Sequence, residues 1–136
     1  MRQITTQASE AFWNGKPYKK SNTQVRTHVH KRGLGGRMLV VELVLHGKVI
    51  AWRQHMALMI TNCGYFTNVT KERLNGVLSG VNVPSPWTNA NSQWPEHLQS
   101  QPSIIQHNFE WYIMVDGCRR KWDGKAIGVT DFCAAI

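Results

Sequence analysis

The segment MLVVELVL, from Met38 to Leu45, decides the fold class. Every residue in it except Glu42 is aliphatic or Met. Such a run is typical of a central strand buried on both faces, because a strand with one solvated face alternates polar and apolar residues. We therefore expect a sheet in which this strand lies between two neighbours.

Further strands are expected on both sides of this segment. From Val25 to His30, residues alternate with a period of two, which indicates a strand with one solvated face. Asp116-Gly117 and Asp123-Gly124 are hairpin signals, and the second precedes a basic C-terminal hairpin. The expected strands are 25–30, 38–45, 49–53, 56–61, 104–115 and 125–129. Their order predicts an antiparallel meander of about four to six strands.

A short helix is expected near the N-terminus. Thr5 or Thr6 can cap its first turn, and Gly15 can end it. Pro17 follows closely and disfavours helical geometry at Lys16, which supports an end at this point.

A second helix is expected in NVTKERLNGVL, from Asn68 to Leu78. Asn68 or Thr70 can cap it, its apolar residues recur with helical spacing, and Gly80 can end it. Lys71 and Arg73 fall outside the apolar stripe, so we expect both at the surface. Two interpretations stay open for them, a solvated helix face or cations presented to a partner.

Residues 81–103 are expected to form a long loop. They contain four of the five prolines and two tryptophans. Loops of this length are uncommon in compact domains, and Trp87 and Trp94 either hold the loop against the core or contact a partner. The chain has no internal repeats, so we predict one α+β domain, 1–136, with an antiparallel sheet packed by two short helices.

Charge is the strongest signal of a partner. The 136 residues include 16 Lys and Arg against 8 Asp and Glu, a net charge of +8. This excess favours polyanions such as nucleic acid, or acidic protein faces, although charge can also serve solubility alone. No segment has the ~20 apolar residues of a membrane helix, so we expect no membrane association.

The sequence offers no recognisable catalytic apparatus. Its three cysteines lack C-x-x-C spacing, which argues against a zinc knuckle or a disulfide framework and for a reducing compartment. His28 and His30 would project from one strand face, but two ligands without an acidic third do not make a zinc site. The Gly-rich segment 33–36 lies between two strands, so it is no phosphate-binding loop. We predict no enzyme activity, no metal and no cofactor. A metal-dependent hydrolase that uses His28 and His30 is a distant alternative.

Basic residues interleaved with aromatic residues occur twice, after Trp13 and before Trp122. Proteins that bind single-stranded nucleic acid use cations for phosphates and aromatic rings for bases. The alternative is that both tryptophans belong to the core. The predicted binding residues are Lys16, Lys19, Lys20, Lys71, Arg73, Trp87, Trp94, Arg119, Arg120 and Lys121. An interface requires these cations to form one patch with accessible rings beside it.

Three segments, in a fixed order after a short N-terminal helix, resemble small accessory proteins of tailed bacteriophages. They are KPYKKSNTQV from Lys16 to Val25, LVLHGKVIAW from Leu43 to Trp52, and NCGYFTNVTKERLNGVL from Asn62 to Leu78. The resemblance implies a small α+β phage product that acts in the cytoplasm of the bacterial host. It supplies no catalytic residues.

Two functions fit these residues. The first is a non-enzymatic phage accessory protein that binds nucleic acid through the basic and aromatic clusters. The second is a phage inhibitor or modulator that binds an acidic host protein, such as a defence or transcription component. The Trp-bearing loop would contact that protein, because such interfaces favour Trp, Tyr and Arg anchors.

Overall fold

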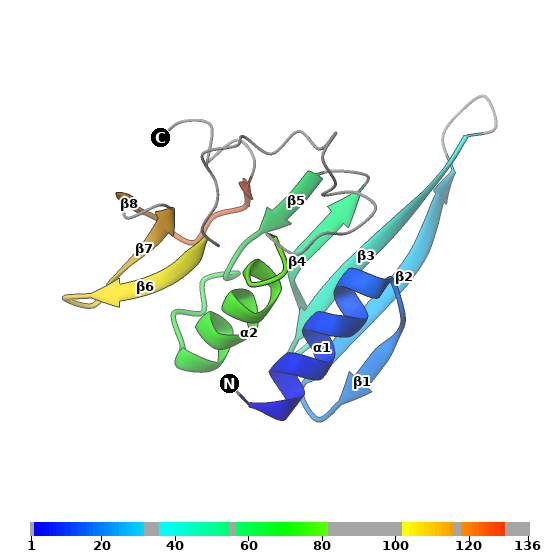
Figure 1. Cartoon of the computed structure of the whole chain (residues 1–136), viewed down its shortest axis with the longest axis horizontal. Coiled ribbons are helices and arrows are strands. Elements are labelled where there is room, and N and C mark those ends of the chain that lie inside the picture. The colour runs from blue at the N-terminus through cyan, green and yellow to red at the C-terminus, as the bar shows by residue number, and fades with distance from the viewer. Residues whose placement is uncertain (1, 32–35, 55–56, 82–101, 116–117, 130–136) are drawn as a thin grey trace.

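The computed structural model describes residues 2–31, 36–54, 57–81, 102–115 and 118–129. Within these ranges the chain forms two helices and two antiparallel sheets, which confirms the predicted α+β class (Figure 1). The elements are α1 Gln3–Asn14, β1 Tyr18–Lys20, β2 Thr23–Lys31, β3 Arg37–Leu45, β4 Lys48–Gln54, β5 Ala57–Ile60, α2 Asn68–Leu78, β6 Ser103–His107, β7 Glu110–Val115, β8 Cys118–Lys121 and β9 Ile127–Gly128. Most of the predicted loop, with Trp87 and Trp94, lies outside the described residues.

The larger sheet has six strands in the order β1-β2-β3-β4-β5-β9. β3 lies inside it, paired with β2 from Thr23 opposite Leu45 to Lys31 opposite Arg37, and with β4 on its other side. The expectation that Met38 to Leu45 forms an interior strand is therefore confirmed. β1, which was not predicted, adds an edge strand to β2.

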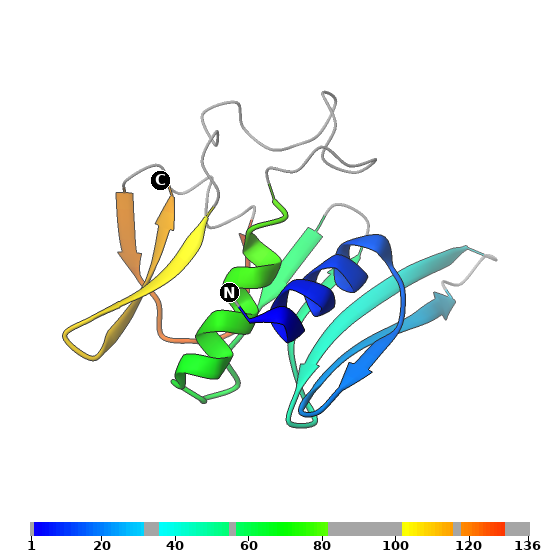
Figure 2. The same cartoon turned by 60° about the horizontal axis from the view of Figure 1, so that its bottom comes forward.

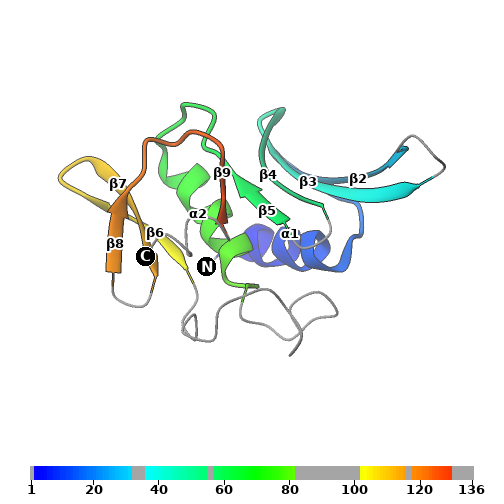
Figure 3. The ribbon, with the colours of Figure 1, turned by 90° about the horizontal axis from the view of Figure 1, so that it is seen from above.

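A bulge in β4 bends this sheet. Leu43 pairs with Ala51, whereas the next residue, Val44, pairs with Val49, so Ile50 is an extra residue in β4. Bulges increase the local twist and bend the strand that carries them. In Figure 3, β2 and β3 curve so that the face away from α1 is concave.

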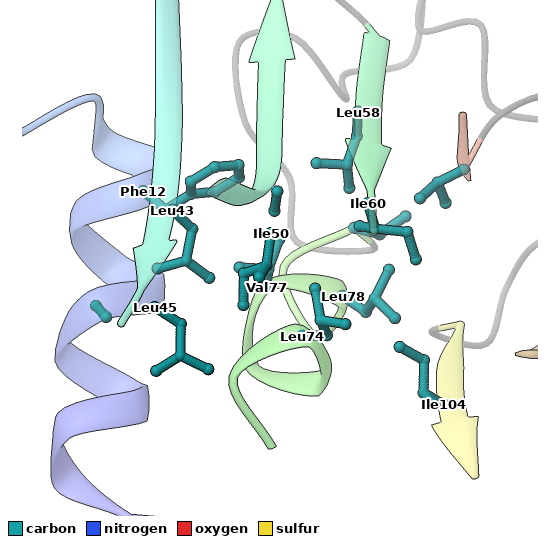
Figure 4. Close-up of a cluster of buried hydrophobic side chains, with 14 of the residues drawn as sticks. Phe12, Leu43, Leu45, Ile50, Leu58, Ile60, Leu74, Val77, Leu78 and Ile104 are labelled. Carbon is teal, nitrogen blue, oxygen red and sulfur yellow. The ribbon is translucent and has the colours of Figure 1, made fainter. Parts of the chain in front are cut away.

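Both helices pack on the same face of the six-stranded sheet (Figure 2). Between the helices and the sheet lies a cluster of buried side chains, several of which are drawn in Figure 4. Its largest fully buried members are Trp111, Phe12, Leu43, Ile50, Leu58, Ile60, Leu74, Leu78, Val25, Val41 and Val77. Burying a large apolar side chain contributes roughly 1.5–3 kcal/mol, so this cluster is the main stabilising feature of the sheet.

The helix ends agree only partly with the sequence. Gly15 ends α1 in the left-handed conformation, with φ of 67°, as predicted. The predicted caps were wrong, because Thr5 lies inside α1, and α2 is capped by Thr67, whose Oγ1 accepts a hydrogen bond from the Thr70 N–H. The bounds of α2, Asn68–Leu78, agree with the prediction, and Gly80 directly follows its C-cap residue Ser79.

The C-terminal strands depart from the predicted meander. β6, β7 and β8 form a separate three-stranded sheet, and the predicted strand 104–115 is two strands joined at Asn108 and Phe109. The two hairpin signals have different outcomes. β7 pairs with β8, with Val115 opposite Cys118, as Asp116-Gly117 predicted, whereas Asp123-Gly124 does not join two paired strands. β9 does not pair with β8 but returns to the larger sheet, where Met59 pairs with Gly128.

Arg73 is buried, so the expectation that it faces solvent is wrong. It is only 3% exposed, and its guanidinium donates to Oγ1 of Thr23 at 3.0 Å and to Oγ1 of Thr5. Its Nη1 also forms an ion pair with Glu72 Oε1 at 3.2 Å. The Thr5 hydroxyl donates to the same carboxylate at 2.6 Å and is the main cause that lowers the pKa of Glu72. Arg73 thus links α2 to α1 and to β2.

We expect Arg73→Ala to lower the free energy of unfolding by about 2–4 kcal/mol, because it removes the buried guanidinium that donates to the hydroxyls of Thr5 and Thr23 and pairs with Glu72. Chemical denaturation measures this change. Lys71→Ala, a cation removed two residues away, should change stability by less than about 0.5 kcal/mol. Equal effects of the two substitutions would show that the Arg73 network contributes nothing beyond a surface charge.

Candidate nucleic-acid interface

Six exposed cations lie on or just before β1, β2 and β3, at one edge of the larger sheet. We call them the basic edge: Lys16, Lys19, Lys20, Arg26, Lys31 and Arg37. In the described part of these strands Glu42 is the single carboxylate, and Arg26 pairs with it. This imbalance of sign makes the edge attractive to anions.

The basic edge unites part of the predicted site with residues that were not predicted. Lys16, Lys19 and Lys20 are exposed, and the pairing of β1 with β2 sets Lys19 opposite Gln24, two residues along β2 from Arg26. Arg26, Lys31 and Arg37 were not singled out. Arg26 lies in the predicted strand 25–30, and Lys31 and Arg37 directly flank predicted strands. The register of β2 with β3 pairs Lys31 with Arg37, five residues along β2 from Arg26.

The second predicted cation cluster lies at the other end of the molecule. Arg119, Arg120 and Lys121 are on β8, whereas β1 lies on the far side of the larger sheet (Figures 1 and 2). Lys121 forms an ion pair with Glu110 at 2.8 Å, and Arg119 stacks over the ring of Tyr112 at 5.1 Å. The expectation of one combined patch is therefore wrong.

The aromatic residues of both predicted clusters belong to the core. Trp122 is buried, and Trp13 packs against the core while its indole N–H donates to the Val77 carbonyl at 2.9 Å. Of the other predicted residues, Lys71 is half-buried and Arg73 is buried. Cations that flank these tryptophans therefore do not imply accessible rings.

An accessible aromatic residue does lie on the concave face of the larger sheet. The register sets Arg26, Glu42 and Trp52 side by side on three neighbouring strands, and sets His28, Val40 and Gln54 side by side in the next row. Because side chains alternate between faces, both rows project away from the helices. None of the described helices covers this face.

These rows surround an open hollow of roughly 350 Å³. Its lining residues are His28, His30, Val40, Glu42, Val49, Trp52 and Gln54. The carboxylate Oε1 of Glu42 lies 3.1 Å from Nη2 of Arg26 and 3.7 Å from Nε2 of His28. Among the described residues, no three His, Cys, Asp or Glu side chains lie close enough to hold a metal ion. The hollow is thus mainly apolar and carries a polar rim.

Trp52 was not predicted as a site residue, although the sequence contains the necessary signal. Val49 to Arg53 gave a strand, and a strand places alternate residues on alternate faces. The face could not be assigned, because the bulge at Ile50 shifts the alternation by one residue.

Exposed aromatic side chains gather at the opposite end of the molecule, near the β6–β7 hairpin. Phe109 is 93% exposed, Tyr65 is 50% and Phe66 is 51% exposed. The ring centroids of Phe66 and Trp111 lie 5.2 Å apart. Trp111 follows Phe109 by two residues. We call these three side chains the aromatic end.

Comparison with known proteins matches more than half of the chain to a protein family. A family model described as Kyanoviridae Gp96 protein matches residues 1–94. This range contains both helices, the basic edge and the hollow, and it ends before β6 and Phe109. No curated protein and no solved structure matches the chain. None of the helices that the structure describes is long and apolar enough to cross a membrane.

Phe109 combines exposure with an unfavourable backbone conformation. It is the second residue of a two-residue hairpin turn between His107 and Glu110, with φ of 66°, and Asn108 before it has φ of 50°. Turns with two positive φ values prefer Asn-Gly, because a side chain in the left-handed region costs roughly 1–2 kcal/mol. With Gly in place of Phe109, the turn would be more stable.

We expect Phe109→Gly to raise the free energy of unfolding by about 1 kcal/mol, because Gly adopts the left-handed region freely. Thermal unfolding followed by circular dichroism measures the change. Phe109→Ala is the matched control. It removes the ring but keeps a side chain at positive φ, so it should bring no comparable gain. A lower melting temperature for Phe109→Gly would contradict the expectation and show that the ring stabilises the fold.

Proposed function

Because the chain belongs to the family of Kyanoviridae Gp96 proteins, a bacteriophage family, we propose that it is a non-enzymatic phage accessory protein that binds nucleic acid. The membership confirms the resemblance to bacteriophage proteins. The proposal itself rests on one observation, the six exposed cations of the basic edge with a single carboxylate among them. It places the protein in the cytoplasm of the infected bacterium.

Electrostatics favours the basic edge over the cluster on β8 as the place of contact. On β8, Lys121 is held by Glu110 and Arg119 is stacked on Tyr112, so these cations already have partners. At the basic edge, Lys16, Lys19 and Lys20 have no ion pair with any described residue. Cations without partners can neutralise phosphates and release counterions, which is the main source of affinity in such complexes.

The concave face beside the basic edge supports the same location. The hollow with Trp52 adjoins Arg26 through Glu42. Proteins that bind single strands combine a basic groove with aromatic rings in this manner. Both features lie within residues 1–94, the range of the family match.

We expect fluorescence anisotropy at low salt to show saturable binding of labelled DNA oligonucleotides, and the affinity to fall steeply as salt rises. A triple variant, Lys16→Ala, Lys19→Ala and Lys20→Ala, should reduce the slope of log affinity against log salt by about 2, since each single-strand phosphate contact contributes about 0.7. The matched control, Arg119→Ala, Arg120→Ala and Lys121→Ala, removes the same number of cations from β8. It should change the slope less.

Two results would contradict the proposal. If the wild-type protein shows no saturable binding at low salt, it does not bind nucleic acid. If the two triple variants lose affinity equally, net charge alone drives the binding, and the basic edge is not the interface.

A second function, binding of a host protein, is favoured by the aromatic end. Phe, Tyr, Met and Arg are enriched in protein interfaces, and a single exposed ring surrounded by polar residues suits an apolar pocket. Around Phe109 the neighbours His107, Asn108 and Glu110 are exposed and polar. This end lies beyond residue 94, outside the family match, so we rank it second.

We expect a nuclease-treated lysate of the host to distinguish the two functions. If the second function holds, a tagged protein should retain a host protein after nuclease treatment, and Phe109→Gly should lose it, because that variant keeps the fold but lacks the ring. Retention of the same protein by wild type and Phe109→Gly would exclude the aromatic end as its binding site. Loss of every partner on nuclease treatment would favour nucleic acid.

A further inference from the structure

The hollow on the concave face has the size and the lining of a site for a flat, hydrogen-bonding ligand. Its apolar lining comes from Val40, Val49 and the indole of Trp52. Glu42 and Trp52 are directly opposite each other on neighbouring strands, and Gln54 lies two residues along on the same face. An aromatic wall thus lies next to a carboxylate and a carboxamide.

The polar groups of this lining retain hydrogen-bonding capacity. Glu42 uses Oε1 for Arg26 and His28, and within the described residues no partner is found for its Oε2. Within the described residues, the side-chain amide of Gln54 and the indole N–H of Trp52 also have no hydrogen-bond partner. A ligand could therefore pair with two or three of these groups without breaking an existing contact.

The carboxylate determines which part of a nucleic acid can enter. A phosphate in the hollow would lie against Glu42 and be repelled, whereas the amino group of a base can donate to it. Glu42 lies between Trp52 and Arg26 in this row. Arg26 is two strands from Trp52, which is about 10 Å across the sheet. If a base occupied the hollow, the sugar-phosphate backbone attached to it would lie on the side of the basic edge.

We propose that the hollow binds one unpaired nucleobase, stacked on Trp52 and hydrogen-bonded by Glu42 and Gln54. The proposal rests on the proposed function, because it assumes that the basic edge holds the phosphates. A base inside a duplex is stacked on both faces and paired along one edge, so it cannot enter such a site. The protein is therefore selective for single strands, and bases with an amino group are preferred.

The test compares a labelled 20-nucleotide oligo(dC) with a duplex of the same length, by anisotropy at fixed low salt. Stacking on an aromatic side chain is worth roughly 1–3 kcal/mol per base, so Trp52→Leu should weaken oligo(dC) binding by about tenfold or more. The duplex affinity should not change. Trp52→Phe keeps an aromatic ring and should retain most of the single-strand affinity.

Two further variants exclude indirect effects. Glu42→Gln should reduce the preference for oligo(dC) over oligo(dT), because the carboxylate that accepts from the amino group is lost. Phe109→Leu removes an exposed ring at the other end of the molecule and should leave both affinities unchanged. Thermal unfolding of each variant shows whether it is folded, and if Trp52→Leu is not, Trp52→Phe and Glu42→Gln still test the site. Intrinsic fluorescence gives an independent readout, since oligo(dC) should quench the wild-type protein more than Trp52→Phe.

The outcomes separate this proposal from the proposed function. Failure of the wild-type protein to bind either oligonucleotide would overturn both. Binding of oligo(dC) that is unaffected by Trp52→Leu, or equal affinity for single strand and duplex, would overturn only the base site. The basic edge would then act through phosphates alone.

Discussion

Packing of both helices on one face of the six-stranded sheet is the constraint on which the remaining structure depends. The buried network of Arg73, Thr5, Thr23 and Glu72 holds α2 against α1 and against the start of β2. An arginine in this position joins three elements at once, because its guanidinium has five donors in a fixed geometry. With the helices held on one side, the opposite face of the sheet stays available for other contacts.

Much of the fold follows from residue patterns, and the departures have specific physical causes. Met38 to Leu45 is an interior strand because its side chains are apolar on both faces, and Gly15 ends α1 because it tolerates positive φ. Arg73 was misplaced because a helical pattern gives the direction of a side chain but not what lies beside it. The turn at Asn108 and Phe109 was missed because Phe is rare in such turns, where Gly is the usual signal.

Only part of the candidate site could be predicted from the sequence. The cations of β1 are exposed as their type suggests, since charged side chains are seldom buried without a partner. The sequence left open whether Trp13 and Trp122 are accessible, and both pack in or against the core, since a buried indole and an exposed lysine are often neighbours in sequence. Trp52 and Arg26 come together only through strand register, and the bulge at Ile50 makes that register unreadable from alternation alone.

The return of β9 to the larger sheet affects how the molecule reaches its folded state. Met59 and Gly128 are paired, so one edge of the larger sheet cannot be completed until a segment far along the chain has been made. Contacts between such distant residues close large loops and slow folding. On a ribosome, the helices and β1 to β5 can therefore assemble early while β5 still has an open edge. During that interval the incomplete sheet is the part of the nascent chain most open to mispairing.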